Sequence, residues 1–367
     1  MVAIKIVSAL AAAGLAVAAP TGQSLEKRAN IDNTILQFAL TLEHLENVFY
    51  KEALKNYTLS DFKAAGYSQD YYNNLKYIAY DEQVHVQALS QALSAAGQTP
   101  NQACTYRFPS IDVYAPPPSH PSIIIPLTTR TSPTFITLSS VLEGVGTSAY
   151  LGAAGLITNK QYLTVAGSIL AVEALHTSLQ REAIGKIPMA NPFETPLDPM
   201  SVYTLAAAFI VSCPDSNTPL PFTAFPGLTY DGQSCTCEEP DCSTPSVYVK
   251  RNEMWGEGWP KWSKHHGKTY SCAPPSAGAD VKFTAAKKIP SGSYVTFVNG
   301  LTVTSVQGQV SGKDITATIP QGIAGQTYVF VTKSDVETTF DDSQVLFGPS
   351  ILEVNPAAPA LDYSVQK

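Results

Sequence analysis

Two short motifs of the same kind place an acid and a histidine where a helix normally buries hydrocarbon. Glu82 and His85 lie three positions apart in residues 75–93, and Glu173 and His176 repeat that spacing in a second apolar segment. Side chains three and four positions apart share one face of a helix, so each pair interrupts an apolar stripe. A buried carboxylate needs a cation or several hydrogen bonds, and inward-facing Glu-x-x-His pairs hold metal ions in helical bundles. These four residues therefore predict metal binding.

A second repeated motif, a glutamate followed seven positions later by a tyrosine, lies in two other apolar segments. Glu43 and Tyr50 form the first copy, and Glu143 and Tyr150 form the second at an offset of 100 residues. A tyrosine two helical turns from a ligating carboxylate is placed to donate a hydrogen bond to a ligand, although simple packing gives the same pattern. The repeat predicts the two glutamates as ligands and the two tyrosines as residues that support ligands.

Position 46 distinguishes the two copies. The first copy has Glu46 one turn after Glu43, whereas the second has Gly146 at the matching place. This comparison favours Glu43 over Glu46 as the ligand of the first helix. Glu46 is then an additional ligand or an acid at the entrance of the site, and His44 is expected to face outward.

Four glutamates and two histidines on four antiparallel helices match the two-metal carboxylate site of ferritin-like bundles. The predicted ligands are Glu43, Glu82, His85, Glu143, Glu173 and His176. We assign Glu43 with His85 to one ion and Glu143 with His176 to the other, and the two remaining glutamates bridge. Oxygen-rich ligation with one imidazole per ion suits iron or manganese. The alternative is a bundle in which these residues form buried ion pairs without metal.

Apolar residues at spacings of three and four predict the helices that position these side chains. We expect four long helices over residues 33–54, 69–96, 133–157 and 160–184, and a fifth, shorter one over residues 200–211. The proline-rich passage 98–132 is long enough to return along the bundle, so the third helix can run parallel to the second.

Beyond Pro214 the pattern changes to short alternating segments separated by Gly, Pro and Asp turns, which predicts a small antiparallel β domain. The expected fold class is α+β, a ferritin-like four-helix bundle with a fifth short helix followed by this domain. The expected divisions are a bundle over residues 29–213, a cysteine- and tryptophan-bearing linker over 214–280, a β-sandwich-like domain over 281–355 and a disordered tail over 356–367.

The N-terminal residues predict export. Residues 1–18 have the charge, apolar run and small residues of a signal peptide, and residues 19–28 read as a propeptide that ends at the dibasic pair Lys27 and Arg28. No later apolar run reaches the roughly 18 residues that span a bilayer. Asn56 begins a glycosylation sequon. The net charge of −7 with no basic patch argues against a nucleic-acid partner.

Export favours disulfides for the six cysteines. Pairing Cys104 with Cys213 would staple the crossover passage to the bundle. The other four cysteines would form two local bridges of open connectivity: Cys235, Cys237, Cys242 and Cys272. A zinc site with nearby histidines is the alternative for these four. Three tryptophans in the same linker either stack on sugar rings or pack within the loop.

A resemblance to a known family rests on four segments: FALTLEHLENVFY, YIAYDEQVHVQAL, FITLSSVLEGVGTSAYLGAAGLI and ILAVEALHTSL. They resemble the ferritin-like domain of secreted fungal proteins of the stress-response and late-sexual-development type, which are similar to plant desiccation-related proteins. The resemblance implies a ferritin-like fold, export, and expression linked to stress or development. The insertion over residues 232–272 is larger than the resemblance leads us to expect.

Two functions from different classes remain open at this point. The first is a secreted di-metal protein that reacts with O2 or peroxide, a ferroxidase- or catalase-like oxidoreductase if it is an enzyme. The second is a non-catalytic cell-wall or surface protein whose bundle is a scaffold and whose β domain binds polysaccharide.

Overall fold

The computed structural model describes the backbone of residues 22–108, 135–237, 246–249, 262–265, 268–271, 275–336 and 340–358. Side chains are described for these residues except 22–30 and 233–271. The chain divides into two compact units. The helical unit runs to Lys186 and resumes over Pro196–Ala224, and the β unit takes Ile187–Thr195 and the chain from Phe225 onward. The signal peptide predicted for residues 1–18 lies outside the described residues.

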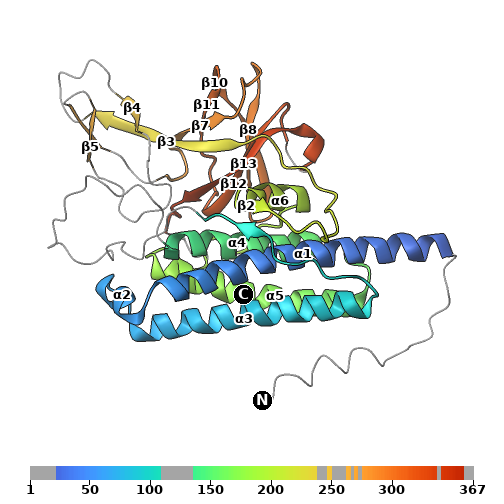
Figure 1. The fold of residues 1–367 in the computed structure, drawn as a ribbon. Helices are drawn as coiled ribbons and strands as arrows, with labels where there is room; N and C mark the ends of the chain where they lie inside the picture. Colours follow the sequence, from blue (N-terminus) through green and yellow to red (C-terminus); the bar gives the residue numbers. More distant parts are fainter. Residues whose placement is uncertain are drawn as a thin grey trace, which may run out of the picture. The chain divides into compact units, whose positions relative to one another are not determined.

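Four long helices of the described chain form the bundle, and Figure 1 shows them side by side. They are α1 (Gly22–Asn56), α3 (Gln69–Ala95), α4 (Phe135–Ala154) and α5 (Lys160–Ala183). Helix α1 packs against α3, and α4 packs against α5. The helical unit also contains two short helices. Helix α2 (Leu59–Ala64) lies between α1 and α3 in the chain, and α6 (Pro199–Ala207) follows α5. The α+β class predicted from the sequence is confirmed.

Local sequence signals set the helix ends. Ser68 caps α3 by accepting a hydrogen bond from the backbone N–H of Tyr71, and Asn159 caps α5 in the same way through Gln161. Gly97, with a φ of +72°, follows the last turn of α3. The buried side chains of α3 recur every three or four residues on one face: Tyr71, Leu75, Ile78, Glu82, His85, Leu89 and Leu93.

The helices differ from the sequence expectation most clearly in three places. Helix α1 begins at Gly22, so the predicted dibasic pair Lys27 and Arg28 lies within a helix whose first side chains are not described. The passage after α1 contains α2, whose Thr58 forms a capping box with Asp61. The fifth helix ends at Ala207, because the next residues pair as a strand with the crossover passage.

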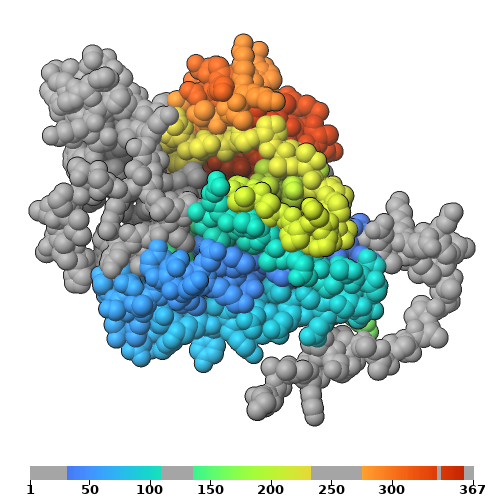
Figure 2. Space-filling model, in the orientation of Figure 1, coloured from blue at the N-terminus to red at the C-terminus, as the bar shows by residue number. Residues whose placement is uncertain are grey.

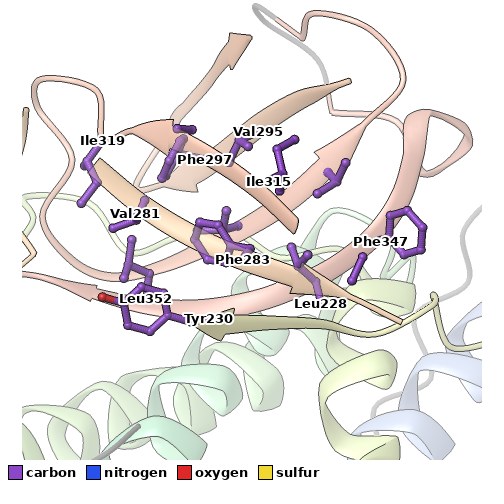
Figure 3. Packing of buried hydrophobic residues seen from close by; sticks show 14 of the residues in the cluster. Leu228, Tyr230, Val281, Phe283, Val295, Phe297, Ile315, Ile319, Phe347 and Leu352 are labelled. Atoms are coloured by element: carbon purple, nitrogen blue, oxygen red, sulfur yellow. The ribbon is translucent and has the colours of Figure 1, made fainter. Parts of the chain in front are cut away.

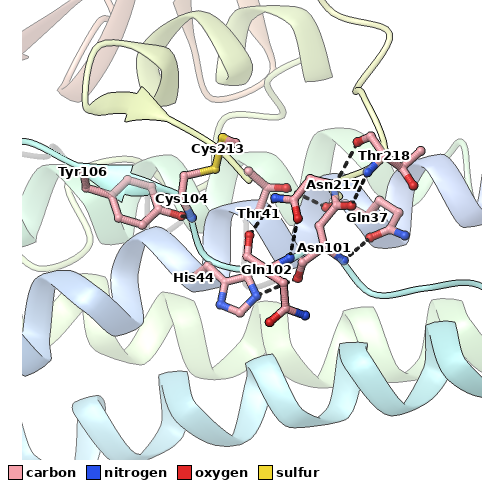
Figure 4. Close-up of a disulfide and its surroundings, with 10 residues drawn as sticks. All are labelled: Gln37, Thr41, His44, Asn101, Gln102, Cys104, Tyr106, Cys213, Asn217 and Thr218. Atoms are coloured by element: carbon pink, nitrogen blue, oxygen red, sulfur yellow. Dashed lines mark hydrogen bonds between the residues drawn. A yellow bond between two sulfur atoms is a disulfide. The ribbon is translucent and has the colours of Figure 1, made fainter. Parts of the chain in front are cut away.

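The described start of the crossover passage is held against α1 (Figure 4). Strand β1 (Thr105–Tyr106) pairs with β2 (Ile210–Ser212), and a disulfide joins Cys104 to Cys213, as the sequence led us to expect. The buried amide of Gln37 donates to the Thr99 carbonyl at 2.7 Å and accepts from the Asn101 N–H at 2.9 Å. These contacts fix the described start of the passage against α1.

His44 takes part in this contact, which corrects the expectation that it faces outward. Its ring is half-buried and its Nε2 lies 2.9 Å from the carbonyl oxygen of Asn101. On the other side of the passage, Asn217 exchanges two hydrogen bonds with Gln102 at 2.8 Å. Figure 2 shows the passage, in teal, on the surface of the bundle beside α1.

Within the described residues, the β unit contains two antiparallel sheets. The order β10-β11-β7-β3-β6-β5 forms the first, with β4 paired to β3, and the order β13-β12-β8-β9 forms the second. The first sheet contains β3 (Leu228–Cys237), β4 (Ser246–Val249), β5 (Trp262–His265), β6 (Lys268–Ser271), β7 (Asp280–Ala285), β10 (Gln309–Ser311) and β11 (Asp314–Thr318). The second contains β8 (Tyr294–Asn299), β9 (Thr302–Gln307), β12 (Gly325–Thr332) and β13 (Val345–Val354).

One apolar cluster joins side chains of both sheets, as Figure 3 shows. Val281 and Phe283 of β7 alternate with outward residues and meet Val295 and Phe297 of β8. The β unit starts earlier in the chain than expected, because β3 pairs with β7 and so brings part of the predicted linker into the sheet. The side chains of Cys235, Cys237, Cys242 and Cys272 lie outside the described residues.

Most of the segment between α5 and α6, Ile187–Thr195, belongs to the β unit. Asn191 donates to the Asn299 side chain at 2.7 Å, and the Thr195 hydroxyl accepts from the Gly300 N–H at 2.7 Å. Gly300 has a φ of +56°, and a Cβ there would lie 2.8 Å from the Asn191 side chain. Glycine is therefore required at this contact.

Helix α5 corrects the expectation that no later apolar run is long enough to span a bilayer, because among the described residues it passes that test by length and composition. It packs against α4 and buries the polar side chains of Glu173 and His176. Buried polar groups of this kind are typical of a core helix in a bundle.

Candidate metal centre

All six predicted ligands point into the bundle, one or two from each long helix. Glu43 lies on α1, Glu143 on α4, and the two Glu-x-x-His pairs on α3 and α5. The four glutamates have 0% exposure. The histidines are also buried, with their Nδ1 atoms directed at the carboxylates.

The six residues form two overlapping groups. His85 Nδ1 lies 3.2 Å from Glu43, 3.5 Å from Glu82 and 3.3 Å from Glu173. His176 Nδ1 lies 3.0 Å from Glu82 and 3.3 Å from Glu143. In each group of four residues, one ligand atom per residue lies within 4.8 Å of the others, and Glu82 and Glu173 belong to both groups. The two acids that the sequence predicted as bridges are therefore the ones common to both groups.

Several buried polar atoms of this cluster have no hydrogen-bond partner within the described part of the chain. They are Glu43 Oε2, both oxygens of Glu82, Glu143 Oε2, both oxygens of Glu173, and the Nδ1 atoms of His85 and His176. A ring nitrogen among three carboxylates can donate one hydrogen bond at most. Unpaired buried carboxylates are costly, and a cation between them removes that cost. The donor set is thus compatible with metal ions that prefer oxygen ligands.

The protonation of the metal-free cluster follows from burial and crowding. Burial raises the pKa of Glu82 to about 7, although the close rings of both histidines oppose the shift. Burial alone would lower the pKa of His85, but the close carboxylates of Glu173, Glu43 and Glu82 outweigh it and raise that pKa to about 12. The metal-free site therefore retains protons that a bound cation would displace.

Each predicted tyrosine supports a ligand from the opposite half of the repeat. The Tyr50 hydroxyl donates to Glu143 Oε1, and the Tyr150 hydroxyl donates to Glu43 Oε1. In both glutamates the bonded oxygen is Oε1, which leaves Oε2 near a histidine. The tyrosines therefore orient the terminal carboxylates.

Glu46 is a fifth buried carboxylate beside these four, with 4% exposure. It stands outside both four-residue groups. Burial raises its pKa well above the usual range, and the charges of Glu173 and Glu82 add to the shift. A Cβ at Gly146 would lie 2.9 Å from an oxygen of Glu46 and 2.9 Å from an oxygen of Glu173. The glycine of the second copy thus makes room for the extra acid of the first.

The sequence reasoning missed three residues around the site. Asp81 lies 3.3 Å from His176 Nε2, on the side of the ring away from the other ligands. Tyr71 donates to Gln180, which in turn donates to the Tyr50 hydroxyl at 3.1 Å. Asp81 precedes a predicted ligand and Gln180 lies one turn after another, and these positions were the available signals.

The remaining predicted site residue with a described side chain is Asn56. It is exposed at the end of α1, where a glycan can be accommodated. Its glycosylation stays a prediction.

Comparison with known proteins agrees with this geometry. Residues 31–186 match the family described as the ferritin-like domain. A relative, Protein rds1 of Schizosaccharomyces pombe, is 23% identical over 199 residues, which cover 54% of this chain and 44% of that protein. The chain thus spans less than half of the length of that relative. Residues 31–186 are thus similar to the ferritin-like domain, and an antiparallel β unit follows them in the chain.

Proposed function

We propose that this protein binds two iron or manganese ions between its four long helices and uses them in redox chemistry. The observation that carries the proposal is the pair of acids, Glu82 and Glu173, shared by two groups of converging ligand atoms. A single ion would need one such group. Two groups with common carboxylates are the arrangement of carboxylate-bridged metal pairs.

Bound iron or manganese would supply electron transfer to dioxygen or peroxide, in a ferroxidase- or catalase-like reaction. The chain supplies a buried site in which all four glutamates are withdrawn from solvent. Tyr50 and Tyr150 fix the terminal carboxylates, and Asp81 accepts the Nε2 proton of His176 so that Nδ1 faces the ligand group.

We also propose export and a role in stress or development. The apolar first 18 residues and the resemblance to secreted fungal proteins support this proposal. The disulfide between Cys104 and Cys213 supports it as well, since disulfides persist in oxidising compartments.

Elemental analysis of purified protein tests the metal proposal. We expect two equivalents of iron or manganese per chain, and loss of both in Glu82→Gln, because that substitution removes a ligand common to both groups. Glu52→Gln is the matched control, since Glu52 is an exposed glutamate on α1. Full metal content in Glu82→Gln would contradict the proposal. An empty wild-type bundle that binds wall glucan would favour the scaffold function instead.

A further inference from the structure

An apolar pocket lies within the bundle, among α1, α3, α4 and α5. Its volume is about 40 Å³. Alanines and aliphatic side chains form most of its wall, including Ile35, Leu36, Leu89, Ala149, Ala153 and Ala166. All of these residues except Ala149 belong to one buried cluster of the helical unit, and Ala149 precedes the cluster residue Tyr150 in the chain.

Tyr150 connects this pocket with the candidate metal centre. It lines the pocket, and its hydroxyl donates to the predicted ligand Glu43. Leu42, the neighbour of Glu43 in the chain, lines the pocket as well. A molecule in the pocket would therefore lie next to the ligands of one ion.

The internal repeat shows where the space comes from. Residues of α1 and α4 correspond at an offset of 100, and those of α3 and α5 at an offset of 91, as Glu82 and Glu173 do. On this basis the pocket residues Ala149, Ile35 and Ala166 correspond to Phe49, Phe135 and Leu75. Phe49 and Phe135 stack with centroids 5.0 Å apart, and all three of these larger residues have 0% exposure. The smaller side chains at the matching positions therefore leave the empty space that forms the pocket.

The same comparison explains why the pocket is apolar. Beside Tyr50, the hydrogen-bonded pair of Tyr71 and Gln180 continues away from the metal centre. The corresponding residues beside Tyr150 are Tyr162 and Leu89, and both line the pocket. Leucine offers no hydrogen bond where glutamine offers two. One half of the repeat thus carries a polar chain and the other half an apolar space.

We propose that this pocket holds dioxygen beside the Glu43 half of the metal centre, an inference that rests on the proposed redox function. A water needs roughly 10–15 Å³ and two to four polar partners, and an engineered cavity of about 150 Å³ holds benzene. A pocket of about 40 Å³ therefore suits a diatomic gas and is too small for an aromatic ring or an acyl chain. Peroxide would lose its hydrogen bonds to water there. The pocket selects dioxygen over peroxide.

The test uses metal-free protein, so that it is independent of the metal centre. Xenon, an apolar probe, should give density in the pocket of pressurised crystals. Dissolved dioxygen should broaden the NMR signals of the methyl groups of Ile35, Leu89 and Ala153 more strongly than those of methyl groups elsewhere in the helical core. Absence of xenon density together with uniform broadening would overturn the inference.

Ala166→Leu, which introduces the residue found at the corresponding position 75, should abolish the xenon density and reduce the selective broadening several-fold. Ala171→Leu makes the same change at an exposed position of α5 and should leave both signals unchanged. Ala149→Phe serves as a second filling variant if Ala166→Leu is not folded. Persistence of both signals in a folded filling variant would also overturn the inference.

Metal content separates this inference from the proposed function. Wild-type protein that takes up two metal ions but no xenon would refute the pocket alone. Protein that takes up xenon but no metal would refute the redox role, and with it the reason for dioxygen as the ligand.

Discussion

Asp81 contacts His176 on the ring nitrogen that faces away from the other ligands, at 3.3 Å. A carboxylate at this place selects the tautomer with a free Nδ1 and makes that nitrogen a stronger donor to a metal ion. The corresponding position before Glu173 is Val172, which cannot accept a hydrogen bond. At the scale of single residues, the two histidines therefore have different surroundings.

Asp81→Asn should weaken one of the two metal positions. We expect a loss of roughly 10- to 100-fold in affinity at the position that includes His176, and little change at the other. Calorimetric titration of metal-free protein would resolve the two steps. Asp70→Asn, an exposed change near the start of the same helix, should leave both steps intact. Equal weakening of both steps in Asp81→Asn would show that the contact acts on the whole site.

Gly146→Ala should separate stability from metal binding. The added Cβ meets the ends of Glu46 and Glu173, which are flexible side chains and can move, so the backbone is not forced to shift. Replacing a helical glycine by alanine stabilises a helix by up to about 1 kcal/mol. We expect the free energy of unfolding of the metal-free protein to hold or rise while metal affinity falls.

Gly167→Ala is the control for this experiment, because nothing lies within 4 Å of a Cβ at that position of α5. The Gly167→Ala protein should have a higher free energy of unfolding than the wild type and the same metal affinity. Denaturant unfolding and metal titration would measure the two quantities. A Gly146→Ala protein with unchanged metal affinity would show that Glu46 and Glu173 adjust without cost.

At the scale of elements, the crossover passage depends on α1. Gln37, Thr41 and His44 follow one another at helical spacing on the side of α1 that meets the passage (Figure 4). The disulfide between Cys104 and Cys213 closes a separation of 109 residues in sequence. The passage is thus fixed at its start by both covalent and polar contacts.

Stability should depend on pH through His44. Burial lowers the pKa of this ring below 6.5, although the hydrogen bond with Asn101 opposes the shift. A lowered folded-state pKa means that the unfolded chain binds the proton more readily. The stabilisation is therefore fully present above a pH of about 6.5 and is lost progressively as the pH falls from that value through the lower folded-state pKa.

His44→Gln should remove this part of the pH dependence, because glutamine can hydrogen-bond to the Asn101 carbonyl and does not titrate in this range. Denaturant unfolding of metal-free wild-type and variant protein, from neutral pH to about pH 5, gives the difference directly. Parallel curves of unfolding free energy against pH for the two proteins would show that His44 does not contribute to the pH dependence.

At the scale of the whole molecule, metal loading should stabilise the helical unit. An ion that binds the folded chain at a free concentration 100 times its Kd adds about 2.7 kcal/mol per site. We expect a higher melting temperature for the helical signal in circular dichroism when iron or manganese is added. The increase should be absent from Glu82→Gln, and an equal increase there would point to binding elsewhere.

The sequence predicted the parts that depend on periodicity and internal repetition. The six inward-facing candidate ligands, the two tyrosines and the four long helices could all be inferred from residue types recurring on helical faces. Asp81 and Gln180 could not, because their partners His176 and Tyr71 lie 95 and 109 positions away in sequence. The pairing of β1 with β2 depends on a contact of the same kind, and the pocket depends on differences in side-chain volume between the two halves.

The segment Ile187–Thr195 determines how the helical unit could be produced as a separate protein. It belongs to the β unit, whereas the residues before it and those that follow, Pro196–Ala224, belong to the helical unit. A shortened protein that stops at Lys186 would lose α6 and Cys213. One that continues to Ala224 would keep the segment but remove Asn299 and Gly300, its hydrogen-bond partners. Separate production of the helical unit therefore calls for a short polar linker in place of residues 187–195.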